Sequence, residues 1–132
     1  MISLIYGPKG SGKTKRLIDG ANEAVRNAKG TVVYISNKPK HSKEVNYNIR
    51  FIDTTEYGIS CECCTVGFLS GILASDNDIE KVYIDGISKM TGIEAADMEG
   101  LYKSLEKLAE KERAEIIFTV SCEKLPAFFG KK

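Results

Sequence analysis

Residues 7–14 read Gly7-Pro8-Lys9-Gly10-Ser11-Gly12-Lys13-Thr14 and match the pattern G-x-x-x-x-G-K-[ST] in full. Glycines in such a loop let the backbone turn tightly and bring its N–H groups around an anion such as a phosphate. Lys13 is placed to reach the β- and γ-phosphates of a nucleotide, and the Thr14 hydroxyl to take a Mg²⁺ coordination position. The alternative is a glycine-rich turn that binds nothing, which would need neither the lysine nor the threonine.

The segments on either side of residues 7–14 supply the context that this pattern requires. The apolar run 2–6 ends at Gly7 and predicts a strand. A helix is predicted from Lys13 to about Gly30, because its apolar residues recur at helical spacing. These residues are Leu17, Ile18, Ala21, Val25 and Ala28. The helix would direct its positive N-terminal end at the same anion.

The rest of the chain continues to alternate between the two kinds of element. Apolar runs at 31–35, 49–52, 81–85 and 116–120 predict four more strands, and 37–48 reads as a polar loop. Helical spacing predicts two more helices, one with Val66, Leu69, Ile72 and Leu73 on one face, the other with Met98, Leu101, Leu105 and Leu108. This alternation predicts an α/β three-layer sandwich, with a mostly parallel five-stranded sheet flanked by helices.

Length and charge limit the classes of protein to be considered. The chain has 132 residues, which predicts a single domain over 1–132. Nineteen basic residues face eighteen acidic ones, so nucleic acid is not indicated as a partner. No apolar run reaches the ~18 residues that span a bilayer, and the N-terminus lacks a signal-peptide pattern. We therefore expect no membrane association, a cytoplasmic protein, and four cysteines present as reduced thiols.

Ligands of parallel α/β sheets bind outside the carboxyl ends of the strands. The polar residues that follow the predicted strands are therefore the candidates for a site. They are the residues of the 7–14 loop together with Ser36, Asp53, Asp85 and Ser121.

On residues 7–14 the sequence resembles the P-loop NTPase superfamily. Val82-Tyr83-Ile84-Asp85 is similar to the Walker B strand of that family, whose aspartate holds Mg²⁺ mainly through water. A simple turn signal is the alternative for Asp85-Gly86. The short strand at 49–52 favours the ASCE branch, which has a strand inserted between those of Walker A and Walker B. That branch includes the RecA-like ATPases and the thymidine kinases.

The resemblance also implies catalytic residues outside the loop. The branch often places a glutamate directly after the Walker B aspartate, where this chain has Gly86. RecA-like proteins can supply the glutamate from another strand end, which would make Glu56 the general base that acts with Lys13. By strand order, Ser121 would sense the γ-phosphate. A surface glutamate and a turn serine are the respective alternatives.

Three other features carry open alternatives. Cys61, Cys63, Cys64 and Cys122 fit either a metal or redox site or small packed side chains. The loop residues Lys38, Lys40, His41 and Lys43 fit either contact with a phosphate-bearing partner or a mobile, solvated loop. Arg113 fits either an arginine finger acting on a neighbouring subunit or a charge at a helix end.

The function predicted is Mg²⁺-dependent ATP binding with slow ATP hydrolysis. ATP is favoured over GTP because Asn37-Lys38-Pro39-Lys40 lacks the aspartate of the N-K-x-D motif. Two alternatives remain: a non-hydrolysing, nucleotide-gated binding module or regulatory subunit, and a small-molecule kinase, although no arginine-bearing lid is visible. Besides the nucleotide, the partners considered are an unidentified protein and further copies of the same chain in a homo-oligomer.

Overall fold

The computed structural model describes residues 1–129, so the last three residues of the predicted domain 1–132 lie outside it. Five strands form one sheet in the order β1-β5-β4-β2-β3, and every neighbouring pair is parallel. The strands are β1 (Ile2–Gly7), β2 (Thr31–Ser36), β3 (Arg50–Asp53), β4 (Ile79–Ile84) and β5 (Glu115–Ser121). The predicted parallel five-stranded sheet is therefore confirmed.

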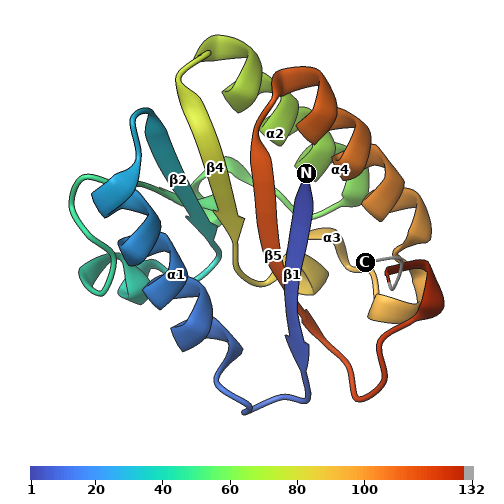
Figure 1. The fold of residues 1–132 in the computed structure, drawn as a ribbon. Coiled ribbons are helices and arrows are strands. Elements are labelled where there is room, and N and C mark those ends of the chain that lie inside the picture. Colours follow the sequence, from blue (N-terminus) through green and yellow to red (C-terminus); the bar gives the residue numbers. More distant parts are fainter. Residues whose placement is uncertain (130–132) are drawn as a thin grey trace.

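Helices cover both faces of this sheet (Figure 1). On one face lies α1 (Lys13–Asn27), whose Leu17, Ile18 and Ala21 are buried against the sheet. On the other face lie α2 (Glu62–Ser75), α3 (Ile87–Thr91) and α4 (Glu99–Glu112). The three layers match the sandwich that the alternation of elements predicts.

The strands are buried on both sides because their side chains alternate between two apolar layers. In β2, Val32 and Tyr34 belong to the cluster under α1, whereas Val33 and Ile35 belong to the cluster under α2 and α4. All four side chains are at most 1% exposed. This pattern explains why the strands appear in the sequence as continuous apolar runs.

The strand between β1 and β4 is β5, not the short strand β3, which lies at the opposite edge of the sheet. A strand does lie between the strands that carry the two motifs, as expected, but it is β5. The short strand at 49–52, which suggested this arrangement, corresponds to the edge strand β3. As a result, the carboxyl ends of β1, β5 and β4 lie side by side. The loop after β1 is thereby brought near Asp85, the residue that follows β4.

Three local features differ from the sequence prediction. Gly30 does not end α1, since Ala28 is the C-cap residue. Gly30 is instead required by close packing, because a Cβ there would collide with the carbonyl oxygen of Asp78. The predicted loop 37–48 contains a 3₁₀ helix, Pro39–Lys43, and α3 was not predicted because five residues give too little periodicity.

No helix within residues 1–129 has both the length and the apolar character needed to cross a membrane.

Candidate functional site at the carboxyl ends of β1, β5 and β4

The loop between β1 and α1 turns on two glycines with left-handed backbones. Gly10 has φ 80° and Gly12 has φ 83°, a region that side chains with a Cβ seldom enter. Gly12 is the N-cap residue of α1, and no side chain caps the first turn of this helix. No acidic residue lies in that turn either. The N-terminus of α1 therefore keeps its partial positive charge available for an anion.

Lys13 begins α1 and its side chain folds back over this loop. It is only 8% exposed, and its Nζ donates a hydrogen bond to the carbonyl oxygen of Pro8 at 2.9 Å. A buried ammonium needs such a partner, because an unpaired buried charge is costly. The contact holds a positive charge directly beside the N–H groups of the loop.

Asp85 follows β4 and is 6% exposed. Its carboxylate accepts hydrogen bonds from the hydroxyls of Thr14, at 3.2 Å, and Thr119, at 3.3 Å. The His41 Nδ1 lies 3.5 Å from its Oδ2, but the geometry is not that of a hydrogen bond. Residues from α1, β4 and β5 thus meet around one buried carboxylate. The sequence did not single out Thr119, because it lies within the apolar run 116–120.

Thr14, Asp85 and Thr119 line an open cleft of about 980 Å³ at the carboxyl ends of the strands. Of the predicted residues, seven line it together with Asp85: Pro8, Lys9, Gly10, Gly12, Lys13, Thr14 and Ser121. Gly7 and Ser11 belong to the loop but do not face the cleft. Gly7 pairs with Ser121 in the β1–β5 register, which explains why Ser121 lies beside the loop. Within residues 1–129, the charged residues that line the cleft are four lysines and three acids: Lys9, Lys13, Lys38, Lys89, Asp85, Glu94 and Glu123.

Glu56, the predicted general base, does not line this cleft. It lies exposed on the 3₁₀ helix Thr54–Tyr57 after β3. Because β2 separates β3 from β4, this strand end is two strand spacings from that of β4, about 10 Å. Glu94 and Glu123 are the glutamates that reach the cleft. The sequence could have indicated Glu123, which lies two residues after the candidate Ser121. Glu94 lies between α3 and α4, where no sequence pattern pointed to a functional residue.

Gly86 has a backbone that explains why no glutamate follows Asp85. Its φ is 82°, and a Cβ at this position would lie 2.9 Å from the Asn37 Oδ1. A side chain here would therefore meet both backbone strain and a steric clash. Any acidic group that acts in the cleft must come from another position.

Most of the segment 37–48 is exposed, but His41 and Val45 are buried. The 3₁₀ helix Pro39–Lys43 turns His41 inward, where it is 8% exposed and faces Asp85. Lys40 and Lys43 remain exposed, and Lys38 lines the cleft. Pro39 at the first position of this short helix favours its formation, because the proline ring fixes φ near the helical value.

Burial changes the acidity of two groups near the cleft. Burial raises the pKa of the Cys122 thiol above its ordinary value of 9.0, an effect that the Lys13 ammonium partly opposes. Burial also raises the pKa of Tyr34 far above its usual value, and the negative charges of Asp85 and Glu44 add to this effect. Both side chains are therefore neutral at pH 7.

Arg113 lies at the other end of the sheet. It is the C-cap residue of α4, with φ 57°, two residues before β5 begins. The cleft lies beyond the far end of that strand, so this arginine does not serve the cleft of its own chain. Its location agrees with the interpretation of a charge at a helix end.

The cysteines also differ from expectation. Cys61 and Cys64 form a disulfide rather than remaining reduced, with their Cα atoms 5.2 Å apart. This separation is within the usual range for disulfides, and it arises because the two residues span the first turn of α2. Cys63 and Cys122 are free.

Comparison with known proteins gives a likeness in structure only. No family model matches the chain, and no match was found among the curated proteins. Among solved structures, the chain is similar to the flagellar accessory protein FlaH from Methanocaldococcus jannaschii, with a TM-score of 0.59 and 16% identity. The match covers 95% of this chain and 62% of the FlaH chain. At this identity, the likeness establishes a shared α/β fold, with a parallel sheet flanked by helices.

Proposed function

We propose that this chain binds ATP with Mg²⁺ in the cleft and hydrolyses it slowly. The observation that carries the proposal is the meeting of Lys13, Thr14 and Asp85 at one end of the sheet, although Asp85 is 71 residues from Thr14 in the chain. A glycine-rich turn that binds no ligand would not require these three side chains to lie together. The structural likeness to FlaH supports a nucleotide-binding fold and no more.

The residues of the cleft fit a triphosphate and its metal ion. Uncapped N–H groups at the start of α1 and the Lys13 ammonium are donors suited to phosphate oxygens. The Thr14 hydroxyl and the Asp85 carboxylate are hard oxygen ligands, which Mg²⁺ prefers, and Mg²⁺ usually keeps several waters beside one or two carboxylates. When bound, the metal ion would neutralise charge that develops on the β- and γ-phosphates.

Each side chain then has a defined task. The Lys13 ammonium exchanges its contact with the Pro8 carbonyl for phosphate oxygens and stabilises negative charge there. Thr119 and Thr14 hold the Asp85 carboxylate in a fixed orientation. Ser121, beside Gly7, is the candidate to contact the γ-phosphate. Glu56, Glu94 and Glu123 are the candidates to orient the attacking water, and the latter two already line the cleft.

One observation favours a second function, a nucleotide-gated module that binds ATP without turnover. Gly86 occupies the place of a catalytic glutamate, and its backbone disfavours one. Single-turnover kinetics separate the two functions. With the protein in excess over γ-labelled ATP and Mg²⁺, we expect slow first-order release of labelled phosphate that Lys13→Ala abolishes. Tight binding with no phosphate release would instead support the gated module.

A further inference from the structure

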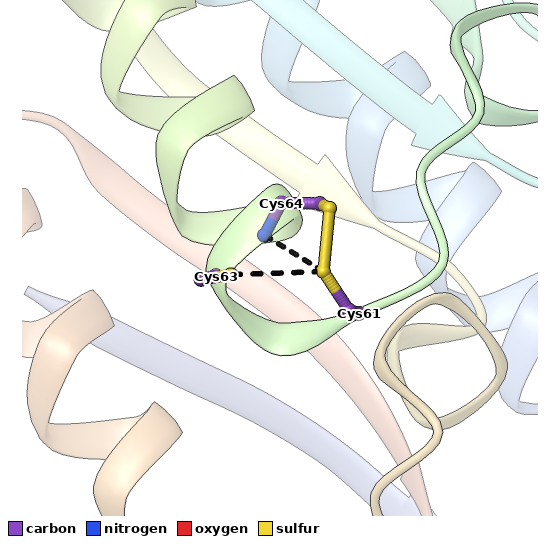
Figure 2. Close-up of side chains that lie close together, drawn as sticks. All are labelled: Cys61, Cys63 and Cys64. Carbon is purple, nitrogen blue, oxygen red and sulfur yellow. Dashed lines mark hydrogen bonds between the residues drawn. A yellow bond between two sulfur atoms is a disulfide. The ribbon is translucent and has the colours of Figure 1, made fainter.

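Three cysteines gather at the first turn of α2, away from the nucleotide cleft. Cys61 is the N-cap residue of this helix, and Cys63 and Cys64 follow in its first turn. The three sulfur atoms all lie within 4.8 Å of one another (Figure 2). Cys63 and Cys64 are exposed and Cys61 is half-buried. None of these residues lines the cleft described above.

The distances agree with those of thiolates that share one metal ion. A metal–sulfur bond of about 2.3 Å places two thiolates about 3.8 Å apart around a tetrahedral ion and about 4.0 Å apart around a trigonal one. The Sγ atoms of Cys61 and Cys63 are 3.7 Å apart. Cys64 is joined to Cys61 by the disulfide, and reduction would let its sulfur move to a similar distance. Little rearrangement of the helix turn is therefore needed.

The helix terminus favours the thiolate form that metal binding requires. The backbone N–H of Cys64 donates a hydrogen bond to the Cys61 Sγ at 3.2 Å, drawn as a dashed line in Figure 2. The positive end of α2 acts in the same direction. Both contacts place partial positive charge beside the Cys61 sulfur.

The number and softness of the ligands point to one kind of ion. Thiolates select soft ions such as Cu(I) and Zn(II). Structural zinc takes four ligands, whereas this group offers three, and within residues 1–129 no histidine, carboxylate or further cysteine completes it. We propose that Cys61, Cys63 and Cys64, when reduced, bind one Cu(I) ion in a three-coordinate site. Each thiol gives up its proton on binding, and the copper remains in the Cu(I) state.

The disulfide makes this site dependent on the redox state. Formation of the Cys61–Cys64 bond ties up two of the three ligands. The oxidised chain, with only the Cys63 thiol left in the group, therefore has no three-coordinate site. Copper binding and the disulfide exclude one another.

The test is anaerobic competition for Cu(I) against a coloured Cu(I) chelator, using the full chain after reduction and removal of the reductant. Wild type and Cys122→Ser, the control that leaves the group intact, should each withdraw one equivalent of Cu(I). The Cys63→Ser variant keeps the Cys61/Cys64 pair and should bind at least about tenfold more weakly, a difference of ~1.4 kcal/mol. The oxidised wild type should withdraw none.

Two results would overturn the proposal. The first is a reduced wild-type chain that leaves the copper with the chelator. The second is a Cys63→Ser variant that binds as tightly as wild type, because the site would then be a two-thiolate site. Circular dichroism of each variant checks the fold. Since Cys63 is exposed, its replacement by serine leaves the core unchanged.

Discussion

The hydroxyl of Thr14 lies 3.2 Å from each carboxylate oxygen of Asp85, although the two residues come from different elements. Thr14 belongs to the first turn of α1, and Asp85 directly follows β4. Their contact depends on the strand order, which sets β5 between β1 and β4 and aligns the carboxyl ends of all three. The Thr119 hydroxyl of β5 completes the arrangement.

This contact predicts energetic coupling in the binding of Mg·ATP. Thr14→Val and Asp85→Asn should each weaken the binding of Mg·ATP about tenfold or more, ~1.4 kcal/mol, while the affinity for ATP without Mg²⁺ changes little. The double variant should lose less than the sum of the two single losses, by about 0.5–1.4 kcal/mol, because both side chains would serve one ion. Asp53→Asn is the control, since Asp53 is the last residue of β3 and does not line the cleft. Fully additive losses would contradict a shared ion.

The general base can be identified among three glutamates. Glu94→Gln or Glu123→Gln should lower the rate of phosphate release about 10²-fold or more if the replaced glutamate orients the attacking water. We expect the loss at one of these two positions, because both line the cleft, and a change of less than about twofold for Glu56→Gln. The affinity for Mg·ATP should stay close to that of wild type in all three. A large loss in Glu56→Gln alone would mean that the segment after β3 moves to the cleft during turnover.

The backbone at Gly86 predicts a loss of stability on substitution. Gly86→Ala should reduce the free energy of unfolding by about 1–2 kcal/mol, because φ is 82° and the new Cβ would meet Asn37. Gly67→Ala is the matched control, since Gly67 lies exposed in α2 with no atom near its Cβ position. That change should stabilise the chain by about 0.5–1 kcal/mol. Urea denaturation measures both, and equal effects at the two glycines would contradict the assignment.

The raised pKa of Cys122 predicts slow alkylation at neutral pH. In a chain whose other three cysteines are serine, the rate of reaction with iodoacetamide should keep rising with pH beyond 9.0, because the thiolate is the nucleophile. Lys13→Ala should move this rise to still higher pH, since the ammonium favours the thiolate. Bound ATP should slow the reaction, because Cys122 lines the cleft. A rate that levels off below pH 9.0 would contradict the burial of this thiol.

Individual residues show which features of the fold and the site could be predicted from the sequence and which could not. Local patterns predicted the five strands, because runs such as 116–120 are buried on both faces and carry an unbroken apolar signal. The loop 7–14 and Asp85 were predicted for a similar reason, since strand ends in a parallel sheet share one edge. Glu94, Thr119 and the inward turn of His41 were missed because their positions depend on packing between distant segments. Glu56 stays a prediction, and its distance from Asp85 was not foreseen because the order of strands along the chain does not give their order in the sheet.

Calorimetric titration with ATP in the presence of Mg²⁺ tests the central claim most directly. The wild-type chain should bind one equivalent, and Lys13→Ala should bind about 10- to 100-fold more weakly, as expected for the loss of a charge-assisted contact of ~1.5–3 kcal/mol. Lys15→Ala is the control, because Lys15 is an exposed neighbour on α1 that pairs with Asp19 and does not line the cleft. This control should bind as wild type does. No binding by the wild-type chain, or equal affinity in wild type and Lys13→Ala, would contradict the account.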